Sequence, residues 1–124
     1  YESVAQFDTT PQYVQTTGTT SFQIADNQVQ QITSIAANYT QPDKTSIGWL
    51  VSTDGGTTWM KLDSSGWVNA DANNPDEFMP IETINQANSL SLTGTTTIDF
   101  RFMLKATASA TPVLESITVN YQYQ

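Results

Sequence analysis

The chain has 124 residues, an ordinary length for one domain, and contains neither cysteine nor histidine. The missing side chains exclude disulfide bonds, thiolate metal sites and every catalytic arrangement that depends on an imidazole. Twelve acidic residues against four basic ones give a formal net charge of −8, which disfavours nucleic-acid and polybasic membrane contacts. No run approaches the roughly 18 apolar residues of a membrane-spanning helix.

The first 19 residues show little hydrophobic pattern. Within them and just beyond, residues 16–20 read Thr-Thr-Gly-Thr-Thr, a low-complexity run that resembles a linker. We therefore predict that residues 1–19 form a linker-like or strand-exchanging segment and that residues 20–124 form a single β-sandwich domain. The chain begins at Tyr1 rather than at Met, so we expect a processed form or an excised piece.

Alternation of apolar and polar residues, which is typical of β-strands, dominates the rest of the chain. It is clearest at 98–105 and 113–123, and we expect these two runs to form a long terminal hairpin. Residues 66–69 read either as a short strand or as an exposed loop. The other expected strands are 20–24, 29–39, 46–52, 58–62, 78–84 and 89–93. About eight short strands at these spacings predict an all-β fold, a two-sheet antiparallel β-sandwich of the jelly-roll type.

The most specific local pattern lies in the turn between two expected strands. Residues 52–59 read Ser-Thr-Asp-Gly-Gly-Thr-Thr-Trp and match the Asp-box pattern Ser-x-Asp-x-Gly-x-Thr-Trp at Ser52, Asp54, Gly56, Thr58 and Trp59. We expect Asp54 to accept hydrogen bonds from turn amides, Gly56 to supply a positive φ, and Trp59 to pack beneath the hairpin. The pattern predicts a structural hairpin rather than a catalytic site.

The Asp-box, followed by a final strand that reads Thr-Pro-Val-Leu-Glu-Ser-Ile-Thr-Val over 111–119, resembles galactose-binding-like (discoidin-type) jelly-roll domains. The resemblance covers about residues 47–123 in pattern, and only the Asp-box is specific. Such domains recur in bacterial surface proteins and phage tail or fibre proteins, and most are non-catalytic glycan-binding or structural modules. Sialidases also carry Asp-boxes, but they are larger propellers with several boxes and an arginine cluster, whereas this chain has one box and one arginine, Arg101.

One loop gathers the oxygen ligands that calcium prefers, at Asp71, Asn73, Asp76 and Glu77. The spacing lacks the glycine and the distant glutamate of an EF-hand, and plain turn chemistry explains the same residues. We therefore expect no cofactor unless this loop holds calcium. A glycosidase-type carboxylate pair is the remaining catalytic option, but the acidic residues read more simply as solvated surface groups, so we expect no enzyme activity.

The three tryptophans carry the other functional hypothesis. Trp49 and Trp59 are expected in the core. Trp67 follows Ser-Ser-Gly, so it either lies exposed, where an indole binds a sugar ring or a protein partner, or folds back as a lid on the sandwich. In the exposed case a shallow ligand-binding site would consist of Trp67, Asn69, Asp71, Asn73 and Asn74.

Two functions from different classes fit these features. The first is a non-catalytic structural or adhesion module of a virion (phage tail, fibre or capsid) or an extracellular appendage, which mediates assembly or host-surface attachment. It predicts other protein subunits or domains as partners, in a homo-oligomer or a larger chain, at an extracellular or virion location. The alternative is a carbohydrate-binding module of a secreted bacterial protein, with a surface glycan as its ligand. Neither function requires nucleic acid or membrane insertion.

Overall fold

Strands make up most of the residues that the computed structural model describes, which are 2–6, 15–23, 29–90, 92, 97–107 and 109–123. Two described 3₁₀ helices, η2 (Pro75–Glu77) and η3 (Ile81–Ser89), lie between the sixth strand and the eighth. In chain order the strands are β1 (Glu2–Gln6), β2 (Gln15–Gln23), β3 (Val29–Thr40), β4 (Ser46–Ser52), β5 (Trp59–Asp63), β6 (Gly66–Ala70), β7 (Met79–Pro80), β8 (Thr97–Lys105) and β9 (Val113–Tyr123).

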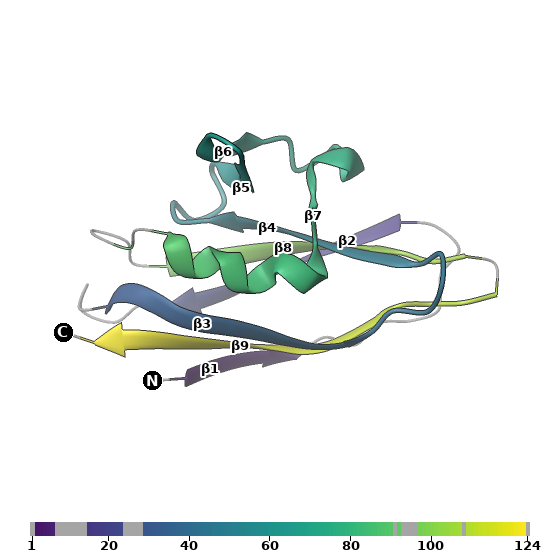
Figure 1. Cartoon of the computed structure of the whole chain (residues 1–124), viewed down its shortest axis with the longest axis horizontal. Coiled ribbons are helices and arrows are strands. Elements are labelled where there is room, and N and C mark those ends of the chain that lie inside the picture. The colour runs from purple at the N-terminus through teal and green to yellow at the C-terminus, as the bar shows by residue number, and fades with distance from the viewer. Residues whose placement is uncertain are drawn as a thin grey trace.

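The strands form two antiparallel sheets that lie face to face (Figure 1). The smaller sheet has the order β1-β9-β3, and the larger has the order β2-β8-β4-β5-β6, with β7 paired to β4. The pairing is nested, because β1 pairs with the last strand, β2 with the strand before it, and β4 with β5. β3 and β4 add to this arrangement, because β3 also pairs with β9 and β4 also pairs with β8. The predicted two-sheet antiparallel sandwich is confirmed.

Two parts of the first 19 residues are strands of this same sandwich. The whole of β1 pairs with residues 116–120 of β9, and residues 15–19 of β2 pair with residues 101–105 of β8. The boundary expected at residue 19 therefore falls inside β2, where the threonine-rich run that resembles a linker is a strand beside β8. Exchange between copies stays a prediction, and residues 7–14 lie outside the described residues.

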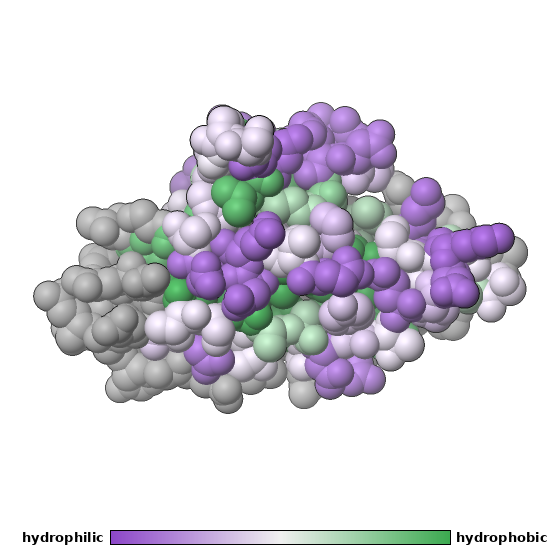
Figure 2. Space-filling model, in the orientation of Figure 1, coloured by the Kyte–Doolittle hydropathy of each residue, from purple (hydrophilic) through white to green (hydrophobic). Residues whose placement is uncertain are grey.

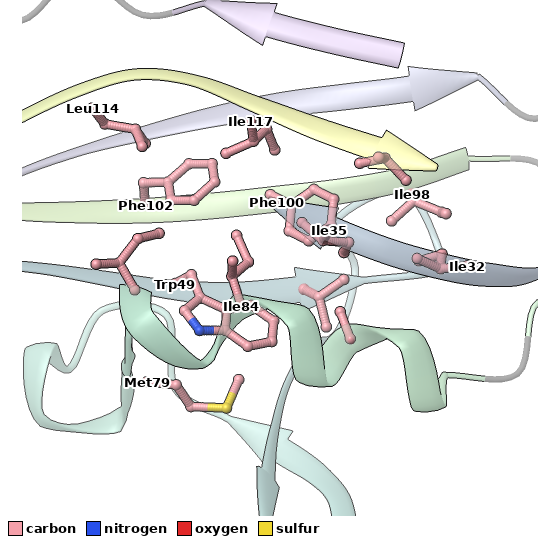
Figure 3. Packing of buried hydrophobic residues seen from close by; sticks show 14 of the residues in the cluster. Ile32, Ile35, Trp49, Met79, Ile84, Ile98, Phe100, Phe102, Leu114 and Ile117 are labelled. Atoms are coloured by element: carbon pink, nitrogen blue, oxygen red, sulfur yellow. The ribbon is translucent and has the colours of Figure 1, made fainter. Parts of the chain in front are cut away.

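Alternate residues of the two sheets fill the space between them with aromatic and aliphatic side chains (Figure 3). The larger sheet contributes Trp49, Phe100 and Phe102, none of which is more than 1% exposed. The rings of Phe100 and Phe102 stack with their centroids 6.2 Å apart. The smaller sheet contributes Ile32, Ile35, Leu114, Ile117 and Val119. Burial of these apolar surfaces is the main force that holds the two sheets together.

The outer face of the larger sheet is also covered, although its alternation predicts a polar, solvated side. Asp99 and Met103 on this face of β8 are only 6% and 7% exposed. The chain between β4 and β7 folds back over them. At one end a methyl group added to Gly56 would lie 3.9 Å from Oδ2 of Asp99, and at the other end one added to Gly48 would lie 2.7 Å from Cβ of Phe78. In Figure 1 the segment between β4 and β7, which includes β5 and β6, lies on the far side of β4 from the smaller sheet.

The strands expected at 78–84 and 89–93 are wrong for most of their length. Among the described residues of these two ranges only Met79–Pro80 is a strand, and η3 follows it directly from Ile81 to Ser89. The residues that η3 buries are Ile81, Ile84 and Ala87, spaced three apart. A three-residue repeat matches one turn of a 3₁₀ helix and puts all three side chains on the core side. The apolar residues of this segment therefore follow a period of three rather than the period of two expected for a strand.

The expected terminal hairpin is also wrong. β8 belongs to the larger sheet and β9 to the smaller one, so the two strands face each other across the core rather than pairing. Alternation shows which side of a strand is buried, but it does not show which sheet the strand joins. The side of β9 that faces the core also changes along the strand. Near its start Leu114 rather than Val113 is buried, whereas further on the buried residues are Ile117 and Val119. The register slips between Asn38 and Tyr39 of β3, which leaves Glu115 as the extra residue of a bulge.

Candidate functional site

The Asp-box turn is held by a small set of hydrogen bonds. Ser52 is fully buried at the end of β4, and its Oγ donates to Oδ1 of Asp54 at 2.6 Å. The same Oγ accepts from the backbone N–H of Gly56 at 3.0 Å. Oδ1 of Asp54 also accepts from the backbone N–H of Thr58 at 2.8 Å, which joins the two ends of the turn. The side chains therefore replace the backbone pairing that a shorter hairpin would have.

Two glycines give the turn its shape. Gly55 and Gly56 have φ angles of 75° and 89°, in the region that side chains with a Cβ rarely adopt. Trp59 is half-buried and packs against the turn, since a methyl group added to Gly56 would lie 3.5 Å from its Cζ2 atom. Trp59 is therefore a support of the turn rather than the core residue expected from the sequence. Oδ1 of the neighbouring Asp99 is buried and has no hydrogen-bond partner among the described residues.

Hydrogen bonding also sets the charge state of two exposed carboxyl groups. The hydroxyl of Ser52, followed by the amide of Thr58, lowers the pKa of Asp54 below its ordinary value of 3.8. In the next hairpin, between β5 and β6, the hydroxyl and amide of Ser65 lower the pKa of Asp63 in the same way. Both carboxylates therefore act as turn acceptors in their ionised form.

Trp67 lies on a strand and folds back over the core. It is half-buried in β6, opposite Leu62 of β5. Its ring meets that of Trp49 edge-on, with the centroids 6.2 Å apart, and its Nε1 donates to Oγ of Ser89 at 2.9 Å. The indole therefore links the β5–β6 hairpin to the end of η3, which is the lid arrangement rather than an exposed platform.

The remaining residues of the expected ligand site are exposed: Asn69, Asp71, Asn73 and Asn74. Their loop is occupied by its own turns, since Oδ1 of Asp71 accepts from the amide of Asn73 and Oδ1 of Asn74 accepts from the amide of Asp76. Of the weak calcium candidates Asp71, Asn73, Asp76 and Glu77, the last forms an ion pair with Lys61. Within the described ranges no group of three acidic side chains is placed to hold a metal ion.

A shallow pocket of about 190 Å³ lies between β4 and β7. Ile47, Gly48, Phe78, Met79 and Met103 form its mostly apolar wall, with polar groups at the rim. Sites for small ligands usually enclose 300–1,000 Å³ and gather several polar groups on one point. The pocket is smaller than that range, and the structure brings no pair of acidic groups into it. Figure 2 shows polar side chains around the apolar strip that lies between η3 and the β5–β6 hairpin.

The backbone groups along one edge of β3 and one edge of β4 are partly covered by other parts of the chain. η3 lies along β3, and Oδ1 of Asn85 accepts from the backbone N–H of Ile35 at 2.9 Å, in place of a neighbouring strand. On β4, Oε1 of Gln41 accepts from the backbone N–H of Ile47 at 3.1 Å, while β7 pairs with residues 48 and 49 and β5 pairs with residue 51. Covering an edge in this way prevents it from pairing with another chain.

β2 is different, because among the described strands it lies at one end of the larger sheet. Its nine residues pair with β8 without a register shift, and β8 is its single partner among the described strands. The strand reads Gln-Thr-Thr-Gly-Thr-Thr-Ser-Phe-Gln and contains no charge and no proline. Charges, prolines, bulges and short length are among the features that protect an edge, and β2 has none of these four. Sequence reasoning missed this site because the run resembled a linker.

Comparison with known proteins adds no relative to this picture: no protein-family model matches the chain, and no curated protein matches it. The described part of the chain has no helix that is long and apolar enough to cross a membrane.

Proposed function

We propose that this chain is a non-catalytic structural module that assembles with other protein subunits in a virion, such as a phage tail, fibre or capsid, or in an extracellular appendage. The observation that supports this most is that β2, among the described strands, pairs on one side only, whereas the edges of β3 and β4 are covered. An extended partner strand can add to such an edge through backbone hydrogen bonds, whatever its side chains.

The composition supports an extracellular or virion location. Charged residues make up 13% of the chain, about half of their usual share, so hydroxyl and amide groups supply most of its polar surface. The resemblance of the Asp-box region to discoidin-type jelly rolls of phage and bacterial surface proteins agrees with such a location. In this proposal the Asp-box stabilises the corner between β4 and β5 and takes no part in contacts with a partner.

The carbohydrate-binding alternative has less support from the geometry. Its central residue, Trp67, is half-buried, with its ring edge-on to that of Trp49 and its N–H bound to Ser89, so less of the indole is available to a sugar than on an exposed platform. In the loop after β6, Oδ1 of Asp71 and Oδ1 of Asn74 already accept hydrogen bonds from the amides of Asn73 and Asp76. We therefore propose assembly rather than glycan recognition.

The proposal is tested by size-exclusion chromatography with light scattering over a wide range of protein concentration. We expect species heavier than the 13.6 kDa monomer, with a share that rises with concentration. Thr19→Lys places a charge in the middle of β2 and should return the chain to a monomer. Ser64→Lys, in the exposed turn between β5 and β6, adds the same charge elsewhere and should assemble like the wild type. A monomer at all concentrations that binds a glycan array would contradict the proposal.

A further inference from the structure

We infer that the partner of β2 is the β2 strand of a second copy, paired antiparallel across a two-fold axis at Thr19. This inference rests on the proposed function and names the subunit that the open edge binds. The paired strands would join the larger sheets of the two copies into one continuous sheet.

The regularity of β2 favours it over the other outermost strands. β1 ends the smaller sheet but has five residues and carries Glu2, and β6 ends the larger sheet at its other side with five residues. Short or charged edges pair weakly with other chains. The nine residues of β2 keep a constant register with β8, whereas β3 is interrupted by register shifts. β2 therefore offers the longest even edge among the described strands.

A second copy fits this edge because an antiparallel pair of identical strands is self-complementary. A two-fold axis places the same residues on both sides of the interface and closes the assembly as a dimer. The register centred on Thr19 pairs all nine residues of each strand, and any other register pairs fewer. In that register Gly18 lies opposite Thr20 and Thr17 lies opposite Ser21. Hydroxyl-bearing residues opposite one another are favourable cross-strand pairs.

The same register keeps like charges apart. Arg101 of β8 is the register partner of Thr19, so the two Arg101 positions of a dimer would be separated by both β2 strands. Three strand spacings amount to about 14 Å. Salt at physiological strength screens charges beyond about 8 Å. The uncharged β2 strands thus act as a spacer between the charged strands of two copies that each carry a net charge of −8.

Single cysteine variants test the register directly, because the natural chain has no cysteine and every disulfide would join two copies. Opposed residues of antiparallel strands have Cα atoms about 4.5–5.5 Å apart, within the range that a disulfide spans. Under mild oxidation we expect Thr19→Cys to form a covalent dimer on a non-reducing gel. Gln15→Cys is the matched control in the same strand, because the two copies of residue 15 would lie about 26 Å apart. Mixing Gln15→Cys with Gln23→Cys should restore the cross-link.

The outcomes separate this inference from the proposed function. A Gln15→Cys dimer as efficient as the Thr19→Cys dimer would mean parallel or unspecific pairing and would overturn the inference. If the wild type assembles by light scattering but neither Thr19→Cys nor the Gln15→Cys and Gln23→Cys mixture cross-links, the inference fails and the proposed function stands. If the wild type is a monomer throughout, both fail. Circular dichroism of each variant, compared with the wild type, shows that the strands are retained.

Discussion

At the residue scale, Asp54 shows how an exposed side chain holds a turn. Its carboxylate accepts from the hydroxyl of Ser52 and the amide of Thr58, and these bonds lower the pKa of Asp54. A carboxyl group whose pKa is lower in the folded state stabilises the fold at a pH above its unfolded-state pKa. That stability is lost as the pH falls through the lowered folded-state pKa.

We therefore expect Asp54→Asn to reduce the free energy of unfolding near neutral pH and to have little effect in strong acid. The loss should be less than about 1 kcal/mol, because the carboxylate is exposed and solvent screens it. Urea unfolding of both proteins from about pH 7 to about pH 2.5 measures the difference. A difference that stays constant over this range would show that the charge of Asp54 does not contribute.

Gly48 illustrates a second residue-scale requirement, which is space rather than charge. A Cβ at this position would lie 2.7 Å from Cβ of Phe78 and 3.3 Å from Cε of Met103, so the covering segment would have to move. We expect Gly48→Ala to lower the free energy of unfolding by about 1–3 kcal/mol, as other overpacked sites do. Gly18→Ala is the matched control, because nothing lies within 4 Å of its added Cβ. Thermal unfolding should show Gly18→Ala at or slightly above the wild-type midpoint, and equal effects of the two variants would contradict this account.

At the scale of elements, η3 covers the edge of β3 at which a neighbouring strand would otherwise pair. Asn85 accepts the hydrogen bond of the Ile35 amide with its side chain, and Ile81, Ile84 and Ala87 fill the core beneath. An uncovered edge at β3 would leave backbone donors without partners and open to another chain.

We expect Asn85→Ala to cost about 1–2 kcal/mol of unfolding free energy, because the partly buried amide of Ile35 loses its acceptor. Hydrogen exchange at this amide should become faster than in the wild type. Gln86→Ala changes the next, exposed residue of η3 and should leave both quantities unchanged. If Ile35 kept its protection in Asn85→Ala, another group would have to be the acceptor.

The elements also show how far the sequence predicts this fold. The alternation of β8 places Phe100 and Phe102 in the core correctly, because a half-buried strand has a period of two. The same alternation contains no information on which sheet β8 and β9 join, since strand pairing depends on contacts far apart in the chain. η3 is not predicted from the sequence, because its apolar residues recur every third position only from Ile81 to Ala87. A run this short also fits part of a strand pattern.

For the candidate site, the sequence predicts local chemistry better than placement. The Asp-box pattern predicts that Asp54 accepts from a turn amide, because this hydrogen bond stays within a few residues of the chain, but the hydrogen bonds of Ser52 Oγ are not predicted. The burial of Trp67 depends on Trp49 and Ser89, which lie far from it in sequence. The sequence therefore does not decide between an exposed and a covered Trp67. The edge of β2 had no local signal, since it is defined by the absence of a neighbour among the described strands.

At the scale of the whole molecule, the proposed assembly combines an uncharged contact with a strongly acidic body. Each copy carries a net charge of −8, while β2 itself carries none. Two copies should therefore repel each other over long distances and attract only where the strands meet. Salt shortens the range of the repulsion, from about 30 Å at 10 mM to about 8 Å at physiological strength.

We accordingly expect salt to strengthen the assembly rather than weaken it. Raising the ionic strength from about 10 mM to about 150 mM should lower the dissociation constant several-fold, because backbone hydrogen bonds at β2 are far less sensitive to screening than the repulsion between acidic bodies. Sedimentation equilibrium at both salt concentrations measures the change. An interface held by ion pairs, for example between Arg101 or Lys105 and acidic groups of a partner, predicts the opposite sign, since screening weakens opposite charges too. A dissociation constant that rises with salt would therefore move the contact away from β2 and toward the charged surface of the chain.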